Sequence, residues 1–342
     1  MPVHPFAQPA GRVEYIQIES TALTNNLLGD PTTRTVAVYL PPGYDQGSDE
    51  FPLFVDIVGF TGSGLAHVGW KAFAESVPQR VDRLVAEGKM GPVIVALPDC
   101  FTALGGNQYI NSAAMGNWAD FLTAEMVPAI EARFRVRKGA ASRALFGKSS
   151  GGYGAIVHGL KHAEHWGAVA CHSGDMAFEW CYLGDLPKTV MHLAGAGGSA
   201  QAFLERIRRG RKMSGSDFHH LMMLAMAATY DPDPSQPYGV RLPVTSDTCE
   251  IIEDRWANWL AWDPVRLARQ EQCLDNLRSL RGIYIDCGSN DQYNLVFGAR
   301  QLSRCLVEQG VRHRFEEFDD NHSSVDYRMD ESLPFLYDAV TG

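Results

Sequence analysis

One short run, Gly147-Lys148-Ser149-Ser150-Gly151, constrains this chain more than any other feature. It stands between a β-rich stretch that ends at Phe146 and a run of small residues typical of a tightly packed helix start. In so sharp a strand-to-helix turn the middle residue takes strained backbone angles, and the glycines two positions before and after it relieve the crowding. The serine hydroxyl then stands above a sheet edge, beside the N-terminus of a helix. The run therefore predicts Ser149 as a nucleophile.

An acid and then a histidine are expected after such a serine, in that order along the chain. Residues 281–286 read as a short strand of β-branched and aromatic residues, and residues 287–291 form the loop that leaves its carboxyl end. Groups that act in open α/β sheets gather at this edge. We favour Asp291 as the acid. Asp286 is the alternative, although a strand-end carboxylate is also a common structural hydrogen-bond acceptor.

The base is expected in the loop after the next strand, residues 311–318, where His322 lies. His322 would take the proton of Ser149 during attack and return it to the leaving group. Asp291 would hold the imidazole in the useful tautomer. His172 also follows a strand, but it precedes the acid, which is the wrong order for this arrangement.

The anionic intermediate of such a reaction needs two N–H donors, an oxyanion hole. One is expected from the residue after the nucleophile, Ser150, and the other from the loop after an early strand. Residues 51–58 read as that strand, and the glycine-rich run 59–64 follows it. We expect the second donor to be the N–H of Phe60, with Thr61 as the neighbouring alternative. The glycine spacing does not fit a phosphate-binding loop.

These segments resemble the esterase D and enterochelin-esterase-like family of the α/β-hydrolase superfamily, which includes S-formylglutathione hydrolases and feruloyl esterases. The resemblance is carried by Val38-Tyr-Leu-Pro-Pro-Gly-Tyr44, Gly59-Phe60-Thr61, Asp286-x-Gly-x-x-Asp291 and Asp320-Asn-His322-Ser323. It implies an α/β-hydrolase fold with a mainly parallel central sheet and helices on both faces. It also implies that the second aspartate of the acid loop is catalytic. Lys148 departs from the family pattern, in which a histidine or other residue often precedes the serine.

Strands that alternate with helices support this fold class. Residues 13–19 and 34–40 are expected to form an antiparallel edge, and helices are expected over 70–76 and 78–87. A chain of 342 residues that is 45% hydrophobic can build a large core. We expect one catalytic domain, residues 1–175 and 276–342, with an inserted and mainly helical cap or lid over 176–275. Compact members of the family have no counterpart of the cap.

Residues of the expected cap offer an apolar surface. Met222, Met223 and Trp259 either pack the cap onto the core or line an acyl or aromatic pocket, for which adaptable thioethers and a flat indole are suited. Lys148 either lies on the surface or attracts a carboxylated substrate.

Charge and cysteine usage limit the partners. A net charge of −10 disfavours nucleic acid and anionic membranes. The seven cysteines lack paired spacing, which favours reduced thiols and a cytoplasmic location. We expect no signal peptide, membrane span, metal or organic cofactor, and His219-His220 has no third ligand at metal-site spacing. A homo-oligomer is possible, and the sequence leaves the oligomeric state open.

The sequence therefore predicts a serine hydrolase that cleaves small-molecule carboxylic esters through an acyl-enzyme. Acyl transfer to an alcohol acceptor uses the same groups and stays open, as does thioester cleavage of the S-formylglutathione type. A non-catalytic binding protein is the third hypothesis, and the complete set Ser149, Asp291 and His322 argues against it.

Overall fold

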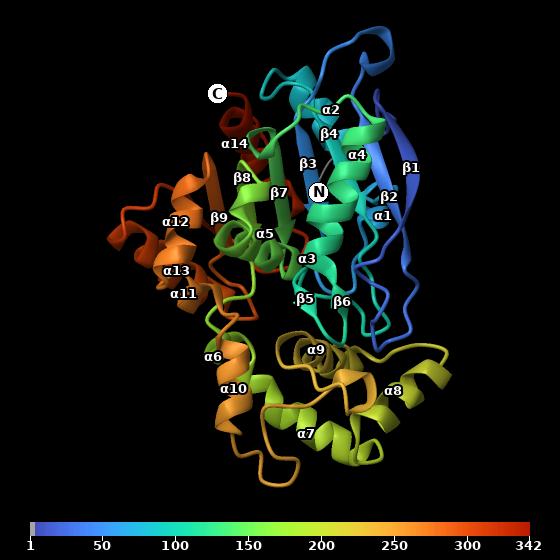
Figure 1. The fold of residues 1–342 in the computed structure, drawn as a ribbon, viewed down its shortest axis with the longest axis vertical. Helices are drawn as coiled ribbons and strands as arrows, with labels where there is room; N and C mark the ends of the chain where they lie inside the picture. The colour runs from blue at the N-terminus through green and yellow to red at the C-terminus, as the bar shows by residue number, and fades with distance from the viewer. Residues whose placement is uncertain (1–3) are drawn as a thin grey trace.

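An eight-stranded sheet forms the centre of the computed structural model, which describes residues 4–342 (Figure 1). Its strand order is β1-β2-β4-β3-β7-β8-β9-β10. The first two neighbouring pairs are antiparallel and all others are parallel, so the expected antiparallel edge is confirmed. The strands of the sheet are β1 (Arg12–Glu19), β2 (Thr33–Leu40), β3 (Leu53–Ile57), β4 (Ile94–Pro98), β7 (Arg143–Lys148), β8 (Ala168–His172), β9 (Gly282–Gly288) and β10 (Arg314–Phe318). A separate small sheet pairs β5 (Asn111–Ser112) with β6 (Gly116–Asn117).

Helices cover both faces of the sheet, as predicted. The central strands are apolar on both sides, with Leu53, Val55 and Ile57 of β3 in one hydrophobic cluster and Phe54 in the other. Such fully buried strands are typical of parallel sheets. One face is covered by α2 (Val77–Ala86) and α14 (Met329–Thr341). The other is covered by α4 (Val127–Arg133), α5 (Ser150–Lys161) and α13 (Leu295–Glu308). Two short helices, α1 (Gly64–His67) and α3 (Trp118–Asp120), complete this part of the chain, and a π-helical segment, Phe121–Met126, joins α3 to α4.

A group of helices lies beyond one end of the sheet (Figure 1). It contains α7 (Leu186–Gly195), α8 (Ala200–Arg209), α9 (Gly215–Tyr230) and α10 (Glu253–Leu260), and the short α6 (Phe178–Cys181) leads into it. Helix α9 is buried along most of its length and shares one continuous hydrophobic cluster with the sheet. By contrast, α11 (Pro264–Leu267) and α12 (Glu271–Ser279) pack against α5. By packing, residues 264–279 therefore belong to the layer that covers the sheet.

The helix expected over residues 70–76 is absent, and that prediction is wrong. Ser76 has extended backbone angles and its hydroxyl accepts a hydrogen bond from the N–H of Gln79, while the Gln79 side chain accepts from the N–H of Ser76. This reciprocal cap begins α2 at Val77, with Pro78 in its first turn. Upstream, Phe73 has a positive φ of 55°, which interrupts any regular helix.

The strained turn predicted from the glycine spacing is present between β7 and α5. Ser149 has φ 58° and ψ −123°, and its N–H donates to the carbonyl of His172 at 2.9 Å. A Cβ atom placed on Gly147 or on Gly151 would lie 2.1 Å from the carbonyl oxygen of Ile57. Both glycines are therefore required for β3 to pass this close to the turn.

We expect Gly151→Ala to lower the melting temperature, because the added methyl group must displace the backbone of β3. The cost should be at least about 1–3 kcal/mol of the free energy of unfolding, as for other overpacked cores. Gly195→Ala in α7 is the matched control, since nothing lies within 4 Å of its added methyl group. Thermal unfolding of both variants measures the difference, and equal stability would contradict the close approach.

Candidate active site

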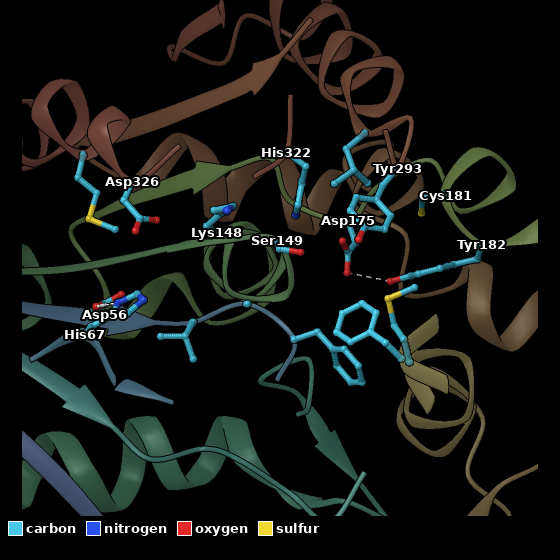
Figure 2. Close-up of a pocket in the computed structure, with 17 residues that line it drawn as sticks. Asp56, His67, Lys148, Ser149, Asp175, Cys181, Tyr182, Tyr293, His322 and Asp326 are labelled. Carbon is cyan, nitrogen blue, oxygen red and sulfur yellow. Dashed lines mark hydrogen bonds and ion pairs between the residues drawn. The ribbon is translucent and has the colours of Figure 1, made fainter. Parts of the chain in front are cut away.

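The loops that leave the carboxyl ends of the parallel strands meet around a cavity of about 220 Å³ (Figure 2). Ser149 lies in its lining, beside His322 from the loop after β10. Lys148 and Asp326 lie on one side of Ser149, and Tyr293 on the other (Figure 2). Of the residues that the sequence analysis singled out, Lys148, Ser149, Phe60, Met222 and His322 share this cavity.

A buried hydrogen bond joins the imidazole of His322 to the carboxylate of Asp291. The Nδ1 atom of His322 lies 2.8 Å from Oδ2 of Asp291, and both residues are buried. The other carboxylate oxygen of Asp291 accepts the N–H of Tyr293 at 2.9 Å. The His322 N–H donates to the side-chain oxygen of Gln292 at 3.0 Å, so the imidazole is fixed at its backbone as well as its ring. Its Nε2 atom forms no hydrogen bond with the described residues and is the nitrogen left for the cavity.

The two rival candidates, His172 and Asp286, form a second buried pair. Nδ1 of His172 lies 2.8 Å from Oδ1 of Asp286, while Nε2 of His172 lies 2.8 Å from the hydroxyl of Ser332. Arg328 donates to Oδ2 of Asp286 at 2.9 Å. Both ring nitrogens of His172 are thus occupied, and neither residue lines the cavity. This pair ties β8 and β9 to α14 and has no nitrogen free for a nucleophile.

The loop after β3 runs beside Ser149. A Cβ atom on Gly59 would lie 3.3 Å from Cβ of Ser149. The hydroxyl of Tyr109 binds both the N–H and the carbonyl of Val58, which fixes the start of the loop. The N–H of Thr61 donates to the carbonyl of Gly105 at 2.8 Å and is therefore not free. By contrast, the N–H groups of Phe60 and Ser150 form no hydrogen bond within residues 4–342, so they remain free to bind a ligand.

Helix α9 supplies an apolar wall. Phe218 and Met222 line the cavity, and the ring of Phe218 packs edge-on against Phe60 of the loop at 5.3 Å between centroids. Met223 and Trp259 do not line it. Both side chains are fully buried, and Trp259 packs against Tyr182 and Tyr230. Of the two alternatives given for these residues, the placement favours packing of the cap onto the core, because both side chains belong to the buried hydrophobic cluster.

Several polar residues of the cavity were missed from the sequence. Asp175, three residues beyond the end of β8, accepts hydrogen bonds from Gln108 at 2.9 Å and from the hydroxyl of Tyr182 at 3.0 Å. Burial raises the pKa of Asp175 above its ordinary value. Its position at the carboxyl edge of the sheet was the available signal. Asp56, His67 and Asp326 line the opposite end of the cavity.

No group of three or more histidine, cysteine or carboxylate side chains in residues 4–342 could hold a metal ion. Across the same residues, no helix is both long and apolar enough to cross a lipid bilayer. All seven cysteines are free thiols.

A mainly parallel eight-stranded sheet, helices on both faces and a serine at a strained strand-to-helix turn define the α/β-hydrolase fold. Residues 30–330 match the model of the family described as "Putative esterase", and the chain belongs to this family.

Among curated relatives, the chain is similar to Esterase MT1326 of Mycobacterium tuberculosis (strain CDC 1551 / Oshkosh), with 28% identity over 157 residues. The match covers 42% of this chain and 33% of the relative, so the chain spans about a third of the length of this relative.

Solved structures share the fold. A ferulic acid esterase superposes with a TM-score of 0.60 at 19% identity, over 96% of this chain and 98% of the other. An S-formylglutathione hydrolase from Agrobacterium tumefaciens superposes with a TM-score of 0.58 at 15% identity, over 99% and 100% of the two chains.

Proposed function

We propose that this protein is a serine esterase that hydrolyses carboxylic esters through an acyl-enzyme. The observation that carries the proposal is the shared cavity of Ser149 and His322, in which the imidazole is held from behind by Asp291 at 2.8 Å. A serine hydroxyl is a weak nucleophile at neutral pH, and an adjacent base with one free nitrogen activates it. Membership of the esterase family and the printed name of the mycobacterial relative support the same activity.

In this mechanism Nε2 of His322 accepts the proton of Ser149 as its oxygen attacks the ester carbonyl. The N–H groups of Phe60 and Ser150 bind the oxyanion of the tetrahedral intermediate. His322 then gives its proton to the departing alcohol, which leaves an acyl group on Ser149. A water molecule repeats the attack with His322 as base and releases the acid. Asp291 stabilises the imidazolium in both halves of the reaction.

Of the segment expected as a cap, residues 176–275, the part before α11 acts in this proposal as a cap that limits the substrate. Phe218 and Met222 of α9, together with Cys181 and Tyr182, bring an apolar wall to the cavity. An acyl or aromatic group of an ester would gain free energy by burial against this wall. The seven free thiols agree with a reducing, cytoplasmic location as part of the same proposal.

Ser149→Ala should abolish hydrolysis, with a loss of about 10⁶-fold in kcat by analogy with other triads. The fold should persist, because the change removes one oxygen at the lining of a cavity. Hydrolysis of a panel of aryl esters and thioesters, with and without added alcohols, measures the loss and separates hydrolysis from acyl transfer. A fluorophosphonate should label wild-type protein at Ser149, as mass spectrometry of the labelled peptide would show. Unchanged turnover in the alanine variant would overturn the proposal.

Replacement of either buried aspartate, Asp291 or Asp286, by asparagine should affect catalysis and stability differently. Asp291→Asn presents the wrong hydrogen-bonding partner to His322, so kcat should fall by about 10⁴-fold. Asp286→Asn removes a charge between His172 and Arg328, so it should lower the melting temperature and change kcat far less. Steady-state kinetics and thermal unfolding on both variants provide the comparison. A larger loss of kcat at Asp286 would reverse the assignment of the acid.

Neighbouring methionines on α9 provide a test of the cap. Met222→Ala should change the ratio of kcat/KM between bulky and acetyl esters, because this side chain faces the cavity. Met223→Ala should lower stability by about 2–5 kcal/mol, as for other buried large-to-small changes, and leave the ratio in place. If both variants lose stability and keep the wild-type ratio, α9 serves packing alone.

A further inference from the structure

The cavity has a polar end as well as an apolar wall, and Lys148 lies between Ser149 and Asp326 of the polar end (Figure 2). Lys148 is the last residue of β7 and directly precedes the nucleophile. Its side chain is partly buried, and its ammonium group forms no hydrogen bond or ion pair with any residue in 4–342. Burial lowers the pKa of Lys148, and the carboxylates of Asp326 and Asp291 oppose this effect from a distance. Removal of a cation from water costs free energy unless an anionic partner contacts it, and a bound ligand can supply that partner.

The other charged groups at this end are already paired with one another. Nδ1 of His67 lies 2.6 Å from Oδ2 of Asp56, and Nζ of Lys71 lies 3.1 Å from Oδ2 of Asp326. Burial alone would lower the pKa of His67, but the carboxylate of Asp56 raises it overall. When His67 is protonated, each carboxylate at this end has its own cation. Lys148 is then the cation at this end that has no carboxylate partner among the described residues, and it lies beside Ser149.

We propose that Lys148 determines specificity by binding an anionic group of the substrate, so that the preferred esters carry a carboxylate close to the reacting carbonyl. The inference rests on the proposed esterase function and deepens it. The negative group would take the place of the missing partner of Lys148, while the rest of the ester lies against Phe218 and Met222. A carboxylate bound by an ammonium group forms a charge-assisted hydrogen bond, which is stronger than a neutral one.

Either half of an ester can carry this charge, and two matched pairs of substrates separate the cases. On the acyl side, the mono-4-nitrophenyl ester of adipic acid is compared with 4-nitrophenyl hexanoate. On the alcohol side, 4-acetoxybenzoate is compared with its neutral methyl ester. For each pair the measured quantity is the ratio of kcat/KM for the anionic ester to that for the neutral ester, after subtraction of spontaneous hydrolysis.

Lys148→Met should lower this ratio roughly tenfold or more for at least one pair, since a hydrogen bond to a charged group is lost. Lys148→Arg should keep most of the ratio. Asp326→Asn should raise it, because removal of a neighbouring negative charge leaves Lys71 free and increases the positive charge at this end. Opposite signs at Lys148 and Asp326 would not arise from a merely structural role. Lys138→Met, which alters an exposed lysine before β7, should leave the ratio unchanged.

Equal ratios in the wild type and Lys148→Met, for both pairs, would overturn the inference while neutral-ester hydrolysis still supported the esterase function. Hydrolysis of none of the four esters would instead overturn the esterase function itself. If Lys148→Met fails to fold, an unchanged or lowered ratio in Asp326→Asn overturns the inference on its own.

Discussion

The close approach of β3 to the turn that holds Ser149 is the constraint on which the site depends. The carbonyl oxygen of Ile57 occupies the space that side chains at positions 147 and 151 would need. Gly147 and Gly151, one on each side of Ser149, therefore both face this single oxygen atom of the neighbouring strand. Because β3 continues into the loop of Gly59 and Phe60, the same approach brings that loop against Ser149. The strained backbone of Ser149 is held by this contact and by its hydrogen bond to His172.

Surroundings, and not residue type, distinguish the two histidine–aspartate pairs. Both pairs have the same 2.8 Å separation, both are buried, and both lie at the carboxyl ends of neighbouring strands. The second ring nitrogen of His172 forms a hydrogen bond with Ser332, and Asp286 also accepts one from Arg328. The pair therefore forms part of the contact between the sheet and α14. His322 keeps its second nitrogen free at the cavity. A base for Ser149 needs that free nitrogen, and the chain order of the three residues agrees with this difference.

Much of this fold could be predicted because turns and strands depend on sequence patterns that span only a few residues. Glycine spacing indicated the turn at Ser149, and strand patterns indicated the sheet and its antiparallel edge. Such patterns could not tell Met222 from Met223, since the rotation of α9 about its axis depends on packing against Phe60 and the core. Asp326 and His67 are far apart in the sequence, and only the tertiary fold brings them to one cavity. The helix expected over 70–76 is absent because the backbone turns at Phe73 and the capping box at Ser76 begins the helix only at Val77.

The charged groups of the cavity are distributed unevenly about Ser149, and the role proposed for Lys148 rests on this distribution. Lys148, which forms no ion pair with the described residues, lies on one side of Ser149, and Asp175 lies on the other (Figure 2). Burial raises the pKa of Asp175, and hydrogen bonds from Gln108 and Tyr182 support its charged form. In the proposed complex, the anionic group of the ester lies toward Lys148 and away from the carboxyl group of Asp175. The neutral part of the same molecule is left for the apolar wall of α9. Under the proposal, charge and apolar surface would therefore select the same orientation of an ester across Ser149.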